Sequence, residues 1–277
     1  MSMNIFESIL YGIISGLCEF LPVSSQSHQM ILHRMFGIYV IDPVRNLFIH
    51  IALLFGIYSA CRSMIDHLRR ERRQNLHSRR KNSHTSRVLL EERFVKNAAL
   101  PMLIGYFVLY YTLGTETNLL LSALFLLLNG LILFISGRML QGNKEIRSMT
   151  YLDSLLIGIS GAFSAIPGIS RIGCITTISA ARGADRQHAL NWAIMLSAPA
   201  LVLLGTLDVV QLISNGGSVP FWVNFIPYLF SAIGAYVGGY YSIRLMRFLA
   251  VRTGYSGLSY YCWGAALFSF LIYLTVV

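Results

Sequence analysis

The fold is decided by the stretch from Ser15 to His28, which reads Ser15-Gly16-Leu17-Cys18-Glu19-Phe20-Leu21-Pro22-Val23-Ser24-Ser25-Gln26-Ser27-His28. It places a carboxylate, several hydroxyls and an imidazole inside a strongly apolar sequence, and its proline interrupts any helix that runs through it. Polar groups are costly in apolar surroundings, and an ionisable residue at membrane depth usually serves function. We therefore expect this stretch to carry chemistry.

The composition is that of an all-α integral membrane protein. Of the 277 residues, 55% are hydrophobic and 12% charged, and the mean hydropathy is +0.59. We expect the N-terminal segment to be retained, because it lacks a basic start and a small-residue cleavage site. The four cysteines have no CxxC spacing, which predicts buried free thiols. Six stretches are long enough to span a bilayer: Leu47 to Arg62, Lys96 to Leu113, Leu119 to Ile135, His188 to Leu212, Phe221 to Ile243 and Leu258 to Val277.

The net charge of +10 is concentrated in one insert between two predicted spans. From Arg62 to Lys96 there are eleven Lys or Arg and four Asp or Glu. The positive-inside rule makes this basic loop, 62–96, cytoplasmic, and it suits contact with anionic lipid headgroups. A nucleic-acid partner is not expected, because almost no aromatic residues are interleaved with the basic ones. The same rule places 114–117 and 214–219 outside, and 137–148 and 244–252 inside.

Two further apolar segments, Asn4 to Phe36 and Leu155 to Arg182, are each broken by a proline into halves too short to span. We expect each to be a re-entrant helical hairpin, the first opening outside and the second inside. At one offset, Ile-Ser-Gly, the proline and a serine match between them. The sequence thus predicts a single membrane domain, 1–277, with an inverted-topology repeat of 1–140 and 151–277 whose broken helices meet at mid-membrane.

The first break offers the clearest candidates for chemistry. Glu19 lies one turn before the proline, and an ionisable group there needs a partner or a polar cavity. The residues that follow have two interpretations. A serine could simply cap the next helix, and the histidine could be a satisfied buried group; alternatively they join Glu19 in a site made of Ser24, Ser25, Ser27 and His28.

The second break reads Pro167-Gly168-Ile169-Ser170-Arg171-Ile172-Gly173. Free N–H groups at a helix start with a permanent cation beside them suit a phosphate. Alternatively, Arg171 pairs with Glu19 as a structural salt bridge, which is compatible with an empty phosphate site. His50, near the outer start of a span, is a weaker candidate, and Asp185 is expected to cap a helix.

Over nearly its whole length the chain resembles the undecaprenyl-pyrophosphate phosphatase family linked to bacitracin resistance. Two motifs carry the resemblance: Glu19-Phe20-Leu21-Pro22-Val23-Ser24-Ser25 with His28, and Pro167-Gly168-Ile169-Ser170-Arg171 with Gly173 and Thr176. The resemblance implies a bacterial plasma-membrane enzyme that opens to the extracytoplasmic side. It would hydrolyse undecaprenyl diphosphate to undecaprenyl phosphate and inorganic phosphate, in lipid-carrier recycling for cell-wall synthesis.

The resemblance also implies roles for individual residues. Ser25 or a water would attack the terminal phosphorus with His28 as general base. Arg171 and Ser170 would hold phosphate oxygens, and Glu19 would orient His28 or bind a divalent cation, Mg²⁺ or Ca²⁺. The other residues expected at the substrate are Ser24, Ser27, Gly168, Gly173 and Thr176.

Several positions depart from the family pattern. Ser15 stands where the family usually has a second acid or amide, and Ser27 replaces a glycine. Asn46 and Asn191 stand where acidic residues are common, and Ile172 replaces a serine. Loss of carboxylates keeps open a transporter or flippase for a polyprenyl phosphate or another anionic lipid, or a regulatory paralogue without chemistry. The sequence leaves the oligomeric state open, a homodimer included.

Overall fold

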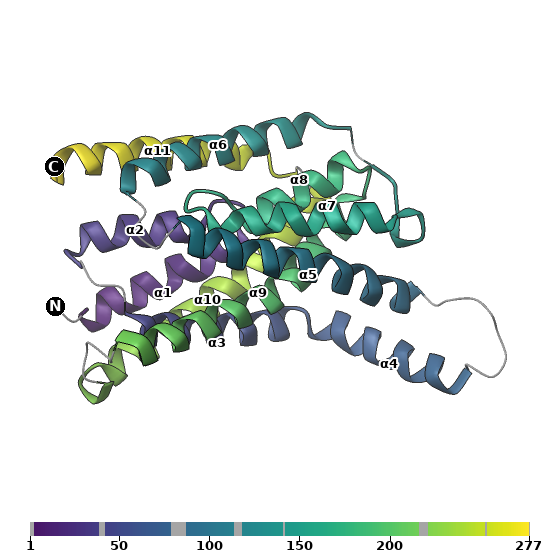
Figure 1. The fold of residues 1–277 in the computed structure, drawn as a ribbon, viewed down its shortest axis with the longest axis horizontal. Helices are drawn as coiled ribbons and strands as arrows, with labels where there is room; N and C mark the ends of the chain where they lie inside the picture. Colours follow the sequence, from purple (N-terminus) through teal and green to yellow (C-terminus); the bar gives the residue numbers. More distant parts are fainter. Residues whose placement is uncertain are drawn as a thin grey trace.

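The computed structural model describes residues 3–38, 42–78, 87–113, 118–140, 142–215, 221–252 and 254–276, which are almost entirely helical. Figure 1 shows the helices running roughly side by side along one direction. In chain order they are α1 (Ile5–Phe20), α2 (Ser25–Met35), α3 (Pro43–Ala60), α4 (Arg62–Ser78), α5 (Arg87–Leu113), α6 (Leu119–Arg138), η1 (Ile146–Ser148), α7 (Tyr151–Ala162), η2 (Phe163–Ala165), α8 (Arg171–Ala181), α9 (Arg186–Asn215), α10 (Phe221–Arg252) and α11 (Gly257–Val276).

Six helices are long and apolar enough to cross a membrane, which confirms the predicted spans: α3, α5, α6, α9, α10 and α11. Large apolar side chains remain exposed along them, among them Phe55, Leu124, Ile233 and Phe270. Such a surface matches a hydrocarbon solvent rather than water. All four cysteines are free and buried, as predicted.

Two proline-broken helix pairs complete the fold. The first, α1 and α2, is separated by the residues around Pro22, and Ser24 takes a positive φ of 64° there. The second, α7 and α8, begins four residues before the predicted boundary and is broken around Pro167. In Figure 1 both outer ends of the first pair lie at one end of the molecule and both outer ends of the second at the opposite end. Re-entry of each pair into a membrane stays a prediction.

The first helix of each half of the chain packs against a long helix of the other half. α1 packs along α10, and α7 packs along α5. The α1–α10 contact is close because small residues face each other at helical spacing: Gly12 and Gly16 on α1 lie against the α10 backbone, and Gly234 and Gly238 lie against that of α1. The pairing is symmetric between the two halves of the chain, and the inverted repeat itself stays a prediction.

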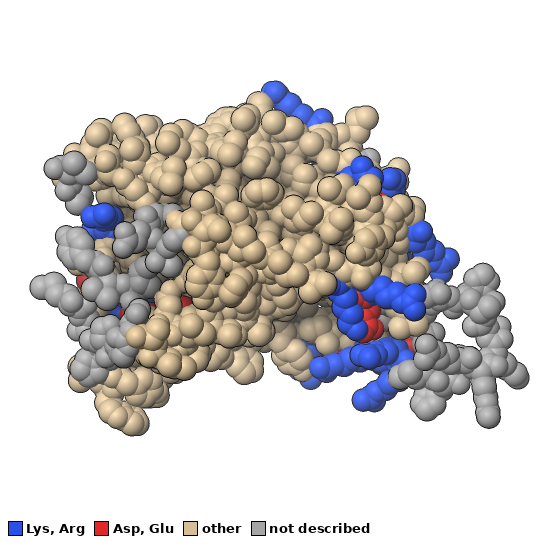
Figure 2. Space-filling model, viewed as in Figure 1, with Lys and Arg blue, Asp and Glu red and all other residues tan. Residues whose placement is uncertain are grey.

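The basic segment differs from the predicted loop. Its first part forms α4, and α5 begins at Arg87, nine residues before the expected start of the span. Opposite charges one turn apart, such as Arg62 with Asp66, support these polar helices. Figure 2 shows Lys and Arg gathered mainly at this end of the molecule. Asp185, at the same end, accepts the Gln187 N–H at 2.9 Å and caps α9, as predicted.

Gly168 is expected to be the least replaceable glycine of the second break. Its φ is +110°, and a Cβ would lie 2.4 Å from Phe125 Cβ and 2.7 Å from the Ser122 carbonyl oxygen. Gly168→Ala should therefore cost about 2 kcal/mol or more, seen as a lower unfolding temperature in detergent.

Two matched glycines separate the causes. Gly37 has a φ of +63° with open space around it, and Gly264 has open space without a positive φ. We expect Gly37→Ala to cost about 1 kcal/mol and Gly264→Ala to cost little. Equal stability of all three variants would contradict the tight junction described here.

Candidate active site

The two helix breaks meet each other inside the bundle. The Gly168 N–H donates to Ser24 Oγ at 3.0 Å, which joins the breaks directly. Asn129, a fully buried residue of α6, joins them a second time. Its Nδ2 donates to the Pro22 carbonyl at 2.8 Å, and its Oδ1 accepts the Ser170 N–H at 2.9 Å. Backbone groups that a broken helix leaves open are thus satisfied by the opposite break.

A cavity of about 350 Å³ lies beside this junction, in the size range of small-molecule sites. One face of α2 forms part of its wall, running from Ser25 at the helix start to Arg34 near its end. The facing walls come from α1, α3 and α9. Five of the predicted site residues line it: Glu19, Ser24, Ser25, Ser170 and Arg171.

Glu19 connects a hydroxyl to a guanidinium at this cavity. Ser25 Oγ donates to Glu19 Oε2 at 2.6 Å, and Arg171 Nη1 donates to Glu19 Oε1 at 2.8 Å. The Glu19 and Arg171 side chains are 9% and 7% exposed, so the ion pair is nearly removed from solvent. Arg171 Nε also contacts Ser164 Oγ at 3.4 Å. The salt bridge between Arg171 and Glu19 that the sequence offered as one interpretation is therefore present. Each buried charge needs such a partner.

This arrangement has the parts of an activated nucleophile. A carboxylate that already accepts the hydrogen bond of a serine hydroxyl is placed to take its proton during attack. A guanidinium offers five N–H donors in a planar fork that matches phosphate oxygens, and Glu19 uses only part of that capacity. The site can therefore present a nucleophile, a base and an anion-binding cation together.

His28 lies away from this group. Its Nδ1 is 2.8 Å from the Ser24 carbonyl oxygen, to which only a ring N–H can donate. Its Nε2 is 2.8 Å from the Tyr261 hydroxyl, and the two rings stack with centroids 5.6 Å apart. Both ring nitrogens are occupied and the residue does not line the cavity. The structure therefore brings Glu19, and not His28, to Ser25.

The other predicted substrate residues serve the junction or the core. Ser27 Oγ shares a hydrogen bond of 2.7 Å with Ser122 Oγ on α6. Thr176 donates to the Ile172 carbonyl of its own helix at 2.7 Å. Gly173 packs against Ser170, Leu133 and Pro22. Ser27, Gly173 and Thr176 do not line the cavity, whereas Ser170 does.

Three N–H groups of the predicted backbone anion site are already paired within the protein. The Gly168 N–H bonds to Ser24, the Ser170 N–H to Asn129, and the Gly173 N–H to the Ser170 hydroxyl at 3.2 Å. These N–H groups hold the fold together and are not open to a ligand. The positive partner for a phosphate is therefore the Arg171 side chain.

The site offers a metal ion one carboxylate next to Ser25, that of Glu19. Within the described part of the chain, no three His, Cys, Asp or Glu side chains are grouped so that they could hold a metal ion. Mg²⁺, however, is commonly bound by one or two carboxylates with substrate phosphates and water. Glu19 fits that mode as the single protein ligand, and it does not form a complete protein site for the ion.

The positions that depart from the family pattern fall in different places. Ser15 lines the cavity and its Oγ accepts the Gln29 Nε2 hydrogen bond at 3.1 Å. Asn46, in the first turn of α3, also lines the cavity. Ile172 is completely buried in the hydrophobic core, and Asn191 lies on α9 away from the cavity. Only the first two departures can act on a ligand directly.

Sequence reasoning missed two important polar residues and undervalued a third. Asn129 and Asp208 each interrupt an apolar span, and an isolated polar residue in such a span is the signal that could have found them. His50, taken as a weak candidate, lines the cavity and is 2.7 Å from Asp208.

The fold and the site together define a multi-pass membrane protein with a polar cavity at the junction of two broken helices. The chain belongs to the bacitracin resistance protein BacA family, whose model matches residues 8–268.

Similar proteins cover almost the whole chain. An undecaprenyl-diphosphatase of Halothermothrix orenii is 27% identical over 265 residues, 94% of this chain and 95% of that protein. One of Thermodesulfovibrio yellowstonii is 28% identical over 274 residues, 98% of each chain. One of Methanobrevibacter smithii is 27% identical over 278 residues, 97% of this chain and 98% of that protein.

Asn129→Leu should loosen the junction of the breaks. The change leaves the buried Pro22 carbonyl and Ser170 N–H without their partner, at about 1–3 kcal/mol for each group. We expect a large fall in the unfolding temperature measured in detergent. Asn191→Leu, a change of the same type on α9 outside the contacts that join the two breaks, is the control and should be much milder. Similar losses for both would show that Asn129 has no special place in the fold.

Proposed function

We propose that this chain hydrolyses undecaprenyl diphosphate to undecaprenyl phosphate and inorganic phosphate, in lipid-carrier recycling for cell-wall synthesis. The observation that carries the proposal is the contact chain from Ser25 through Glu19 to Arg171 at a cavity of suitable size. Membership of the BacA family and the undecaprenyl-diphosphatases that resemble the chain support the same substrate. A pure transporter would need the arginine but neither nucleophile nor base.

Ser25 attacks the terminal phosphorus in this proposal. Its Oγ forms the new P–O bond while the bond from that phosphorus to the bridging oxygen breaks, and the prenyl phosphate leaves with the electron pair. Glu19 Oε2, 2.6 Å from the hydroxyl, receives the proton of Ser25. Water then hydrolyses the seryl phosphate, which releases inorganic phosphate and restores the serine.

Arg171 holds the oxygens of the terminal phosphate and the charge that develops on them. Without substrate it pairs with Glu19 at 2.8 Å and remains nearly buried, so its orientation is set before the ligand arrives. A cation fixed in place in a water-poor site stabilises a transition state without further reorganisation. Glu19 thereby orients the cation with one oxygen and the nucleophile with the other.

His28 acts as a positioning residue for the nucleophile in this account. It holds the Ser24 carbonyl from one side while Tyr261 on α11 holds the ring from the other. Ser24 has the strained φ of 64° directly before Ser25. A fixed Ser24 sets the direction in which the Ser25 side chain leaves the start of α2.

A divalent cation, Mg²⁺ or Ca²⁺, is proposed to enter with the diphosphate. Glu19 would be its protein ligand, and oxygens of the substrate and water would supply the remaining ligands. When bound, such an ion neutralises charge on the diphosphate. The single carboxylate at the site favours a cation that arrives with substrate over one that resides in the protein.

We further propose that the cavity opens to the extracytoplasmic side of a bacterial plasma membrane. The basic end, which carries α4 and the start of α5, would face the cytoplasm by the positive-inside rule. The outer ends of α1 and α2 lie at the other end of the molecule. The basic surface would contact anionic lipid headgroups. The oligomeric state, a homodimer included, is left to measurement.

Phosphate release from a polyprenyl diphosphate by the purified protein tests the activity and its residues. We expect Ser25→Ala and Glu19→Gln each to lower kcat by about 10²-fold or more, because nucleophile and base act together. His28→Gln keeps a side-chain donor for the Ser24 carbonyl, so it should retain more activity than His28→Ala. If His28 were the base, the glutamine and alanine variants would be equally inactive. Binding of substrate with no phosphate release under any metal condition would favour transport.

Metal removal tests the cation. A chelator should lower phosphate release, and added Mg²⁺ or Ca²⁺ should restore it, while substrate-free protein should show little change in unfolding temperature with either ion. A strong stabilisation of the substrate-free protein by the ion would instead indicate a resident site. Unchanged activity in chelator would remove the cation from the mechanism.

A further inference from the structure

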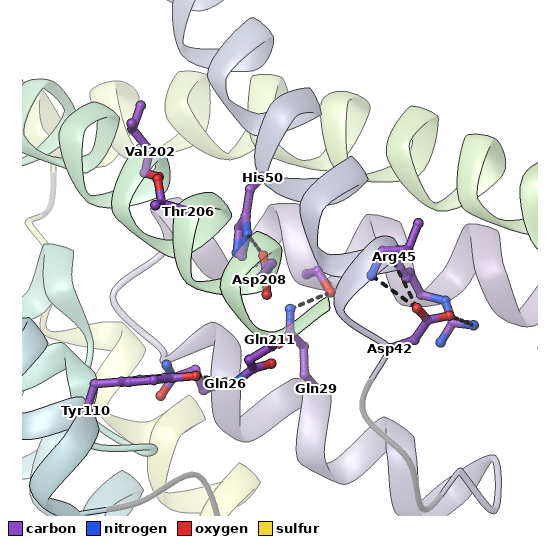
Figure 3. Close-up of polar contacts among 12 residues, drawn as sticks. Gln26, Gln29, Asp42, Arg45, His50, Tyr110, Val202, Thr206, Asp208 and Gln211 are labelled. Atoms are coloured by element: carbon purple, nitrogen blue, oxygen red, sulfur yellow. Dashed lines mark hydrogen bonds and ion pairs between the residues drawn. The ribbon is translucent and has the colours of Figure 1, made fainter. Parts of the chain in front are cut away.

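A second polar group lies on the wall of the same cavity. His50 on α3 and Asp208 on α9 are joined through Nδ1 and Oδ2 at 2.7 Å, and their side chains are 14% and 10% exposed. Figure 3 shows the two side chains pointing toward each other, with Gln211 and Gln29 nearby. All four residues line the cavity that contains Glu19 and Arg171.

One nitrogen of this group is left for a ligand. Gln211 Nε2 donates to the Tyr110 hydroxyl, and Gln29 Nε2 donates to Ser15 Oγ. His50 Nδ1 is held by Asp208, whereas Nε2 has no hydrogen bond to any residue in the described part of the chain. Polar atoms in such partly buried positions normally have a partner, so Nε2 is suited to an atom that enters the cavity.

The other nitrogen groups of the cavity indicate which kind of ligand atom His50 Nε2 would meet. Arg171 is shared with Glu19 at the inner site, and Arg34 at the end of α2 is exposed. Arg45 is 3.7 Å from Asp42 and does not line the cavity. His50 thus offers a further nitrogen on the cavity wall that can meet a phosphate oxygen. A phosphate can accept from an imidazole N–H or donate to a bare ring nitrogen.

We propose that the His50–Asp208 pair is a second phosphate subsite, which holds the phosphate attached to the prenyl chain. The inference rests on the proposed function, in which Arg171 and Ser25 hold the terminal phosphate. Each phosphate of a diphosphate needs polar partners, and both groups line one cavity. Leu204 and Leu207 line it on the same helix as Asp208, which gives the first carbons of the chain an apolar wall.

The pair also holds the His50 ring in a fixed orientation. Asp208 fixes the orientation of the ring, so Nε2 is presented without loss of side-chain freedom on binding. The contact between α3 and α9 is close at this point, because Gly205 lies under His50 and Leu47. The subsite is therefore built on two packed helices, which hold His50 and Asp208 in place relative to each other.

The test compares two ligands on the purified full-length protein. Binding of farnesyl methylenediphosphonate, whose P–C–P bridge cannot be hydrolysed, and of inorganic phosphate is measured from ligand-dependent shifts of the unfolding temperature. We expect His50→Gln to weaken diphosphonate binding about tenfold and to leave phosphate binding within about twofold. Arg171→Ala should weaken both ligands. Asp208→Asn, which retains the side-chain shape, should act in the same direction as His50→Gln.

Thr206→Val is the matched control, because the Thr206 hydroxyl donates to Val202 of its own helix at 2.8 Å and lies two residues from Asp208. It should change neither affinity. Should His50→Gln fail to unfold cooperatively, Asp208→Asn carries the same comparison. Unchanged diphosphonate binding in the variants would overturn the subsite, and equal weakening of both ligands would assign the pair to released phosphate instead. Absence of diphosphonate binding in the unsubstituted protein would overturn the proposed function as well.

Discussion

The junction between the two helix breaks is the constraint on which the rest of the structure depends. A helix that stops between apolar neighbours leaves backbone groups with no water to receive them. Here the groups of one break meet those of the other, through Ser24 with Gly168 and through Asn129 with Pro22 and Ser170. Neither break would be satisfied alone, so the two halves of the chain must come together where the cavity forms.

The pairing of backbone groups across the junction determines which group can supply positive charge to an anionic ligand. The N–H groups that begin α8 would ordinarily attract an anion, but the Ser170 N–H closes the junction with Asn129 and the Gly173 N–H is capped by the Ser170 hydroxyl. The positive group is therefore a side chain, Arg171, and a buried side-chain cation requires a carboxylate beside it. Glu19 meets that need and contacts Ser25 with its second oxygen. The carboxylate that pairs with the buried cation is thus the same group that contacts the proposed nucleophile.

The sequence predicted the parts of the fold that depend on local pattern. The spans follow from continuous hydropathy and the breaks from Pro22 and Pro167. In contrast, α4 was missed because the weight of its charged residues hid the amphipathic pattern to which Met64 and Ile65 belong. The direction of His28 required the helix phase: at about 100° per residue, the cavity face of α2 runs from Ser25 to Arg34, and His28 projects on the other side. Asn129 and Asp208 were missed because their partners lie far away in sequence.

The position of Ser15 shows how the cavity works with few acids. Where the resemblance led us to expect a second acid or amide, Ser15 supplies a hydroxyl, and Gln29 from α2 brings an amide to it. One carboxylate opposite one guanidinium leaves the inner site balanced in charge, and the other acid of the cavity wall, Asp208, is paired with His50. The negative charge of the diphosphate that Arg171 does not neutralise then needs another partner. In our proposals that partner is His50 on the cavity wall or a divalent cation that enters with the substrate. Glu19 can therefore hold the arginine and the serine at once because no neighbouring carboxylate competes for either.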